Sequence, residues 1–129
     1  GAISVIEGCD SNGCEYMTGG TVVILGQVGD NFGAGMTGGM AFVYDPKNQF
    51  EKRVNSETVI WQSVETKYWI NYLKKLVEEH FNETNSLLAK KIFENFNAEI
   101  LNFLQICPKE MINKLENPIS LKSPIKEVI

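Results

Sequence analysis

The sequence predicts a mainly β fold: a right-handed parallel β-helix (a single-stranded solenoid) followed by C-terminal α-helices. The first observation is a repeat, because the string Met-Thr-Gly-Gly at 17–20 returns at 36–39, a period of 19 residues. The second is a short apolar run after each repeat, and the third is the crowding of glycine between the runs. Such a period is too short for a helical repeat of about 33 residues or for a βαβ unit, and it suits one coil of a solenoid. The right-handed sense follows the general rule for parallel crossovers.

Each coil is predicted to contribute one strand. Apolar runs at 2–6, 21–25 and 40–44 each follow a glycine, and these glycines lie one period apart. Residues two apart in a strand point to the same face. Stacking the runs by the period therefore predicts two apolar columns on one face, Ile3/Val22/Ala41 and Val5/Ile24/Val43.

The glycines between the strands are predicted to form the turns of the coils. Their density within 26–39 rules out a helix, since each glycine costs roughly 0.8–1 kcal/mol relative to Ala in a helix interior. Stacked turns need positive φ values and close backbone approach, which glycine allows. The predicted structural turn glycines are Gly19, Gly20, Gly26, Gly29, Gly33, Gly35, Gly38 and Gly39.

Helical spacing replaces the strand pattern in the second half of the chain. Residues 58–61 are predicted to form a last, degenerate strand, because they fall on the period but lack a preceding glycine. The apolar residues of 69–81 recur at helical spacing, which predicts an amphipathic helix. A second helix is predicted after a cap at Asn85 or Ser86, and a third, short helix after Pro108.

These patterns divide the chain into the C-terminal coils of a solenoid (1–64), a helical cap (65–116) and an extended or mobile tail (117–129). The end of a solenoid exposes an unpaired strand, which a cap protects. Gly1 has no such cap before it and the chain has no initiator Met, so we expect a fragment of a longer protein.

Composition argues against several classes of protein. With 43% apolar and 22% charged residues, the chain has the composition of a soluble globular domain. No apolar run approaches the roughly 18–20 residues of a membrane span, and no signal peptide is visible. The net charge of −4 comes without a basic stripe, which argues against nucleic acid as a partner. The cysteines Cys9, Cys14 and Cys107 lack the spacing of a disulfide framework and favour a reducing compartment.

Two patterns look like binding motifs, and in both a defining residue is missing. Gly26, Gly29 and Gly33 are spaced like a phosphate loop, but no Gly-Lys-Ser/Thr follows and no helix can begin there. Cys9 and Cys14 have the spacing that opens a plant-type iron–sulfur motif, but the next cysteine of that motif is absent. We therefore predict turns and buried thiols, with no cofactor and no metal held by this chain.

The remaining candidates are also predicted to be structural, so no catalytic residue is expected. His80, the single histidine, lies on the apolar stripe near the end of its predicted helix, where it can bind a terminal carbonyl. Acidic residues at turns are predicted to be solvated rather than to form a catalytic pair; they are Glu7, Asp10, Glu15, Asp30 and Asp45. Aromatic residues at helical spacing are predicted to pack in the core rather than to stack on a ligand; they are Tyr68, Trp69, Tyr72, Phe81, Phe93, Phe96 and Phe103.

Three strings carry a resemblance to a known family. They are residues 1–8 (Gly-Ala-Ile-Ser-Val-Ile-Glu-Gly), 14–20 (Cys-Glu-Tyr-Met-Thr-Gly-Gly) and 31–39 (Asn-Phe-Gly-Ala-Gly-Met-Thr-Gly-Gly). These strings closely resemble the C-terminal glycine-repeat (GXGXG) domain of glutamate synthase large subunits, whose turn pattern GxxGxxxG is met by Gly26, Gly29 and Gly33. The resemblance is strong to about residue 56 and weaker beyond.

The resemblance implies a structural domain of an enzyme that makes two glutamates from glutamine, 2-oxoglutarate and two electrons. It implies upstream amidotransferase and FMN-barrel domains in the same chain, with FMN and a 3Fe-4S cluster held by the parent chain. Electrons would come from NAD(P)H through a small subunit, or from ferredoxin. In that family the catalytic cysteine and the cofactor contacts lie upstream, so none maps onto a residue here. The expected compartment is the cytoplasm, with the plastid as the alternative.

Two other functions stay open at this point. One is a stand-alone β-solenoid that mediates contacts in another redox complex, since a formylmethanofuran dehydrogenase subunit shares this solenoid type. The other is a small enzyme with a site in the glycine-rich groove. An amidotransferase domain and a flavin barrel before Gly1 would exclude the first, and turnover by the isolated chain would favour the second.

Overall fold

The computed structural model describes residues 3–7, 14, 17–115 and 118–119. The predictions for Cys9, Asp10, Glu15 and most of the tail therefore lie outside the described residues. In chain order the elements are β1 (Ile3–Ile6), β2 (Thr18–Ile24), β3 (Gly38–Tyr44), the 3₁₀ helix η1 (Phe50–Lys52), β4 (Val59–Ser63), α1 (Lys67–Thr84), α2 (Leu87–Glu94), α3 (Phe96–Glu99), the 3₁₀ helix η2 (Ile100–Asn102), β5 (Phe103–Pro108) and the 3₁₀ helix η3 (Lys109–Lys114).

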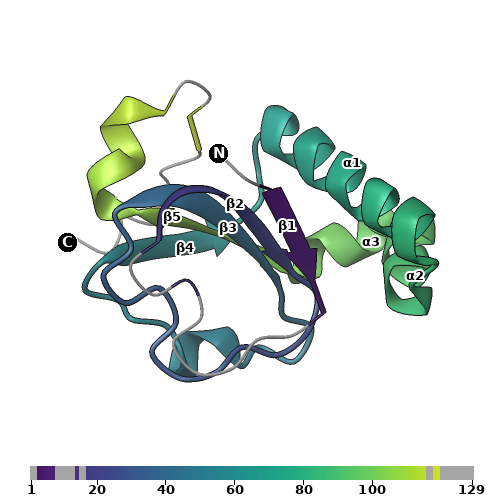
Figure 1. Ribbon diagram of the computed structural model, residues 1–129, viewed down its shortest axis with the longest axis horizontal. Helices are drawn as coiled ribbons and strands as arrows, with labels where there is room; N and C mark the ends of the chain where they lie inside the picture. Colours follow the sequence, from purple (N-terminus) through teal and green to yellow (C-terminus); the bar gives the residue numbers. More distant parts are fainter. Residues whose placement is uncertain (1–2, 8–13, 15–16, 116–117, 120–129) are drawn as a thin grey trace.

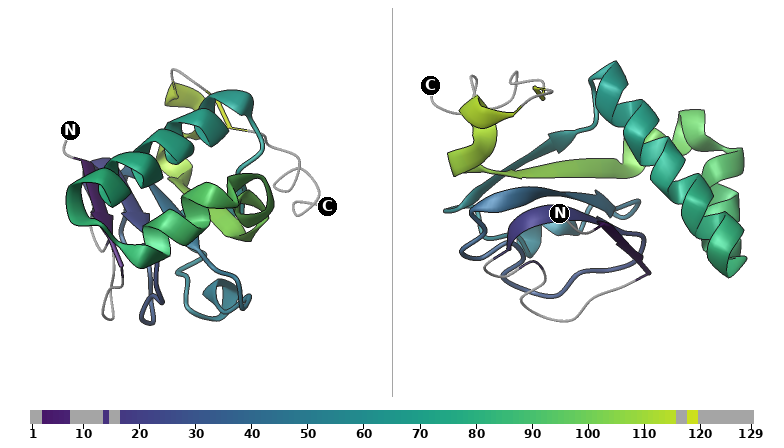
Figure 2. Two further views of the ribbon diagram at one scale, coloured as in Figure 1. Left: turned by 90° about the vertical axis from the view of Figure 1, so that its right-hand side faces the viewer. Right: turned by 45° about the horizontal axis from the view of Figure 1, so that its top comes forward.

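The strands form a single mixed sheet in the order β1-β2-β3-β5-β4. β1, β2 and β3 are parallel, whereas β5 runs antiparallel to both of its neighbours, β3 and β4. Figure 1 shows α1 and α2 on one side of the sheet and η1 with its flanking loops on the other, and the views in Figure 2 agree. The molecule is thus a helical layer, a sheet and a layer of loops.

The prediction of a parallel β-helix is wrong, because the structure has one open, mixed sheet of five strands. The predicted last strand exists as β4, but it does not pair with β3 as a further coil would. β5 takes that place, and nothing in the sequence pattern predicted it. It fits because its residues alternate between the two layers: Phe103 and Cys107 pack on the helix side, Ile106 on the loop side. The predicted division at 64 and 116 stays a prediction.

The repeat step is real in the parallel strands, but its register differs from the predicted columns. Val22 pairs with Ala41, 19 residues on, as predicted, whereas Ile3 pairs with Thr21, 18 residues on. A one-residue shift moves side chains to the opposite face of the sheet. The first members of both predicted columns, Ile3 and Val5, therefore share the helix face, while Val22 and Ala41 face the loops.

Each face of the sheet has its own apolar core. The helix side buries Val23, Leu25, Met40, Phe42, Leu73, Leu76, Val77, Ala89, Ile92, Phe96, Phe103 and Cys107. The loop side buries Ile24, Val28, Phe32, Met36, Ala41, Val43, Phe50, Val59 and Ile106. Burying one large apolar side chain is worth about 1.5–3 kcal/mol. Both layers therefore contribute to stability, and the glycine-rich loops supply the second core instead of lying free on the surface.

The predicted helices and the cap between them are largely confirmed. α1 contains the predicted stripe and ends at Thr84, followed by the C-cap Asn85, whose φ of 56° is left-handed. Ser86 caps α2, its Oγ accepting a hydrogen bond from Ala89 N at 3.1 Å. The segment after Pro108 is the 3₁₀ helix η3. Among the described residues, no helix is both long and apolar enough to cross a membrane.

Candidate functional site

The glycine repeat forms an irregularity where β2 and β3 begin. Thr18 pairs with Gly38 and Thr21 with Met40, so β2 carries one residue more than β3 between these pairs. Such a β-bulge locally kinks and twists the strands. Gly39 has a φ of +87°, and a Cβ there would lie 2.9 Å from the carbonyl oxygen of Gly20. The bulge therefore accepts no side chain at Gly39.

The other predicted turn glycines lie in contrasting environments. A Cβ on Gly38 would collide with the carbonyl oxygen of Thr18, whereas a Cβ on Gly19 would meet nothing within 4 Å. Positive φ values occur at Gly20, Gly33, Gly35 and Gly39. Gly26 and Gly29 lie in the loop after β2. That each glycine is required for the turns stays a prediction.

A cavity of about 160 Å³ lies beside the carboxyl ends of β2 and β3. Its floor consists of buried apolar side chains, Leu25, Val28, Val43 and Phe50. Its rim carries polar and charged residues from three separate segments: Gln27 after β2, Asp45 and Lys47 after β3, and Gln49 and Arg53 on either side of η1. Among the lining residues, Gly26 belongs to the glycine pattern that is spaced like a phosphate loop.

Two rim residues are held by hydrogen bonds. Asp45 caps η1, because its Oδ1 accepts from Gln49 N at 2.9 Å and its Oδ2 accepts from Phe50 N at 3.0 Å. Arg53 Nη1 donates to the carbonyl oxygen of Val28 at 3.2 Å and lies 3.7 Å from Asp30 Oδ1. Asp30 and Asp45 thus have separate structural partners and do not form an acid–base pair.

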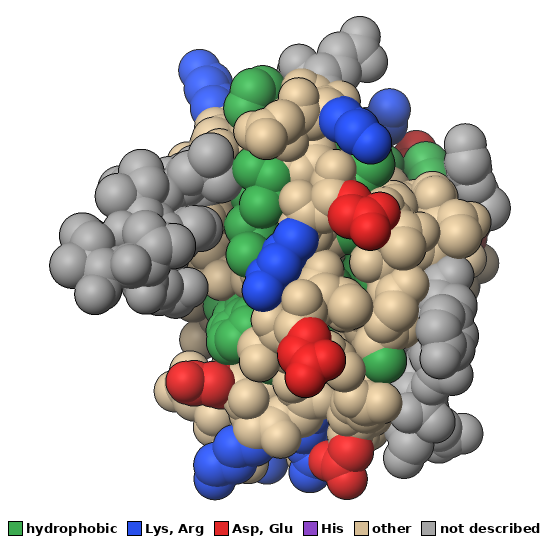
Figure 3. All heavy atoms as spheres, turned by 90° about the vertical axis from the view of Figure 1, so that its left-hand side faces the viewer, with side chains coloured by type: hydrophobic (Ala, Val, Ile, Leu, Met, Phe, Trp, Pro, Cys, Tyr) green, Lys and Arg blue, Asp and Glu red, His purple; other side chains and the backbone are tan. Residues whose placement is uncertain are grey.

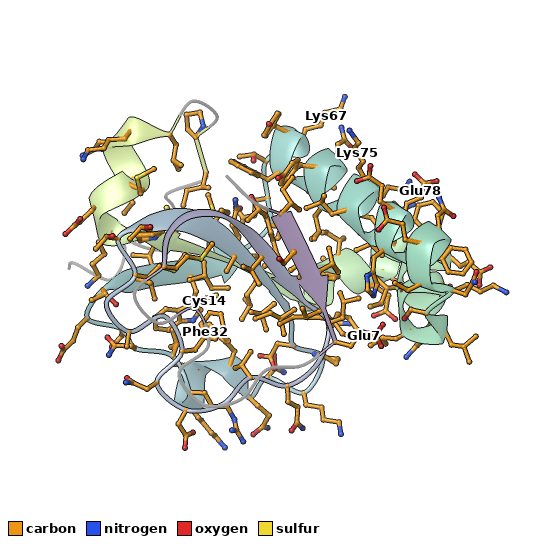
Figure 4. The ribbon with its side chains drawn as sticks, in the orientation of Figure 1. Glu7, Cys14, Phe32, Lys67, Lys75 and Glu78 are labelled. Carbon is orange, nitrogen blue, oxygen red and sulfur yellow. The ribbon has the colours of Figure 1, made fainter. Side chains whose placement is uncertain are left out.

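His80 joins the helical layer to the end of β1. Its Nε2 lies 3.0 Å from Glu7 Oε2, and Figure 4 places Glu7 just beyond β1, beside the lower ends of the helices. Hydrogen bonds from Ser86 and then from His80 lower the pKa of Glu7 below its usual value. The His80 ring contacts this carboxylate and not the helix-terminal carbonyl that was predicted. Instead, one carboxylate ties β1 to the junction of α1 and α2.

The described cysteines do not form a ligand set. Cys14 packs against the loop-side core, in which Phe32 is buried (both are labelled in Figure 4), and Cys107 is buried on the helix side of β5. Burial raises the pKa of the Cys107 thiol to about 11. In the described part of the chain, no three His, Cys, Asp or Glu side chains come close enough to hold a metal. These residues do not fit an iron–sulfur cluster, and the cavity is too small for a flavin.

The aromatic residues of α1 pack together and onto the sheet. Trp69 and Tyr72 lie 6.0 Å and 6.3 Å from Phe42, between ring centroids. Tyr68 stacks on Tyr72 at 6.2 Å and stays half exposed. Basic and acidic side chains are interspersed on the face in Figure 3, without a large patch of one sign. These aromatics contribute to packing, as predicted.

Comparison with known proteins gives a consistent family relationship. The family model described as "GXGXG motif" matches residues 1–109. The chain is 54% identical over 125 residues, 97% of its length, to the glutamate synthase [NADPH] large chain of Azospirillum brasilense, of which it covers 8%. It is 41% identical over 128 residues to the glutamate synthase [NADH] of Schizosaccharomyces pombe, and 47% identical over 112 residues to the ferredoxin-dependent glutamate synthase of Pyropia yezoensis. These matches cover 99% and 87% of the chain but 6% and 7% of the relatives.

Proposed function

Because the chain belongs to the GXGXG motif family, we propose that it is a structural domain of a glutamate synthase and holds no catalytic residue of its own. The identity of 54% along 97% of the chain to a glutamate synthase large chain carries this proposal. The matches favour it over a stand-alone module of another redox complex. The chain spans about 6–8% of the length of its relatives, so the reaction belongs to the longer protein.

The parent protein would form two glutamates from glutamine, 2-oxoglutarate and two electrons. Its amidotransferase and FMN-barrel domains, together with the 3Fe-4S cluster, would lie outside this chain. The names of the relatives specify NADPH, NADH and ferredoxin in turn, so the electron donor would differ among parents. We assign the protein to the cytoplasm, or to the plastid where the parent is plastid-borne.

The domain would brace the parent's catalytic domains. β1 lies at the edge of the sheet, and Ile3 on it is 54% exposed. A sheet edge offers unpaired backbone groups and so invites contact with another segment. A five-stranded sheet with a core on each face is a stiff support for that contact. The contact would hold the site that releases ammonia and the site that uses it in alignment.

The substitution Ile3→Lys tests this role, with Leu87→Lys as the matched control. Both side chains are exposed, Leu87 at 81%, so each change is expected to alter the free energy of unfolding of the 129-residue chain by less than about 0.5 kcal/mol. In the longer protein, Ile3→Lys is expected to lower glutamine-dependent glutamate formation while ammonia-dependent formation persists. Leu87→Lys is expected to change neither activity.

The comparison of the two substrates separates bracing from damage to the catalytic domains. Loss of both activities in Ile3→Lys would mean that the variant disrupts the synthase site itself. Unchanged glutamine-dependent activity in Ile3→Lys would refute the role of the β1 edge. If the longer wild-type protein forms no glutamate from glutamine and 2-oxoglutarate with any electron donor, the assignment to glutamate synthase is wrong.

A further inference from the structure

We propose that the cavity at the carboxyl ends of β2 and β3 binds a small organic acid, one carboxylate on an apolar body the size of a benzene ring. This site goes beyond the bracing role, because a brace needs no ligand. Ligands of sheets with parallel strands commonly bind outside the carboxyl ends of those strands. β2 and β3 end at this cavity, and the loops after both strands line it.

The volume of the cavity selects the size of the ligand. At about 160 Å³, it matches an engineered protein cavity of about 150 Å³ that binds benzene. Pockets for drug-sized ligands and cofactors are about 300–1,000 Å³. Nucleotides and flavins are therefore too large, and water alone would leave the apolar floor without a partner.

The floor selects an apolar body for the ligand. Phe50 and Val43 are almost fully buried under the cavity, and Leu25 and Val28 complete the floor. These side chains come from three segments; Val28, Val43 and Phe50 belong to the loop-side core and Leu25 to the helix-side core, so the floor is pre-formed. A bare inorganic anion would gain nothing from this surface, whereas a small ring or branched chain would bury apolar area on it.

The rim selects a negative charge. Lys47 and Arg53 stand at the cavity, and the carboxylate of Asp45 is engaged by two backbone N–H groups. The guanidinium group of arginine has five N–H donors. Within the described structure, the hydrogen bond and the ion pair of Arg53 both use Nη1. The N–H groups at Nε and Nη2 can therefore donate to a ligand. A carboxylate between Lys47 and Arg53 would meet two positive charges against the single negative charge of Asp45, so the charged residues of the lining sum to +1.

Benzoate and benzamide are a matched pair of probes, because they share ring and shape but only benzoate is charged at neutral pH. The 129-residue chain, labelled with ¹⁵N, would be titrated with each compound while amide chemical shifts are followed. Saturable benzoate shifts are expected at Gly26 to Val28 and at Lys47 to Phe50, with a dissociation constant on the order of 1 mM. Benzamide is expected to bind more weakly.

Two lysine variants test the rim. Lys47→Met removes a charge at the cavity, and Lys52→Met removes one from an exposed position of η1 that does not line the cavity. Lys47→Met is expected to weaken benzoate about two- to fivefold, the range of a single exposed ion pair, without affecting benzamide. Lys52→Met is expected to bind benzoate like the parent chain, and the dispersion of the amide spectrum confirms that both variants are folded.

Several outcomes would overturn the proposal. Absence of saturable shifts at these residues up to about 50 mM benzoate would exclude the site. Equal affinity for benzoate and benzamide would exclude recognition of the carboxylate. Equal losses in Lys47→Met and Lys52→Met would attribute benzoate binding to net charge rather than to the cavity.

Discussion

Replacing Gly39 by Ala is expected to destabilise the chain much more than replacing Gly19 by Ala, although both glycines lie in the bulge where β2 and β3 begin. Gly39 has a φ of +87°, and its new Cβ would lie 2.7 Å from Met17 Cε and 2.9 Å from the Gly20 carbonyl oxygen. Gly19 has neither constraint, since a Cβ there meets nothing within 4 Å. The pair therefore isolates the cost of a side chain inside the bulge.

The magnitude follows from two terms. Left-handed backbone costs an L-residue about 1–2 kcal/mol. The methionine side chain of Met17 can move aside, but the backbone oxygen of Gly20 cannot, and overpacking adds about 1–3 kcal/mol. Gly39→Ala is thus expected to lose about 2–5 kcal/mol of unfolding free energy. For Gly19→Ala, the free energy of unfolding is expected to stay unchanged or to rise by up to about 1 kcal/mol, because Ala reduces the conformational entropy of the unfolded chain.

Urea unfolding followed by far-ultraviolet circular dichroism measures both values. With a slope of about 1–3 kcal/mol per molar urea, Gly39→Ala should lower the midpoint by about 1 M or more. A total stability of about 5–15 kcal/mol leaves the variant measurable. Equal midpoints for Gly39→Ala and Gly19→Ala would refute the claim that the bulge excludes a side chain.

Three further predictions concern buried or paired groups. Gln105→Met should raise the free energy of unfolding, measured by urea titration, by about 1 kcal/mol. The buried Gln105 Oε1 has no hydrogen-bond partner within the described structure, and an unpaired buried acceptor costs about 1–3 kcal/mol. A loss of stability in this variant would contradict the prediction. Hydrogen bonds from Ser86 and then from His80 lower the pKa of Glu7 in the folded state, so these contacts stabilise the fold above the ordinary value of 4.5 and are lost as pH falls through the folded value. The free energy of unfolding of Glu7→Gln should therefore be lower than that of the parent chain by less than about 1 kcal/mol at pH 6, and the two values should converge near pH 3. A difference that does not change with pH would exclude a stabilising role for these contacts. Because burial raises the pKa of Cys107 to about 11, its thiol should resist alkylation at pH 8 until urea unfolds the chain, and rapid labelling of the native protein would show that it is accessible.

The parts of the fold that were predictable are those with local signals. The apolar runs after the repeated glycines mark β1, β2 and β3, and the stripe from Trp69 marks α1. β5 was missed because a short mixed run after helical residues has no local pattern that separates strand from helix. Its position between β3 and β4 is set by pairing with residues far away in the chain. The β-helix prediction failed for the same reason, because a repeat step fixes neighbours but not how the sheet ends.

The candidate cavity was predictable only in fragments. The glycine pattern at Gly26 predicts a turn and gives no sign of a cavity. Lys47, Phe50 and Arg53 follow a different strand, and the chain must fold before they meet Gly26. One signal was present: the aspartate after β3 followed by a short polar turn, since Asp45 caps η1 and so fixes that turn. Spacing within one loop cannot reveal a site whose parts come from three segments.

The antiparallel strand also explains why the proposed brace would act through only one edge of the sheet. The two edge strands are β1 and β4. β4 has side chains covered on both faces, because Val59 is buried in the loop-side core and Ile60 packs with the helix-side core, which η3 extends through Met111 and Ile112. β1 leaves Ile3 exposed, and among the described residues it pairs with β2 alone. Since soluble proteins seldom leave an apolar strand edge open, the antiparallel pair of β5 and the edge strand β4 would complete one end of the sheet, and contact with the rest of the longer protein would occur at the other.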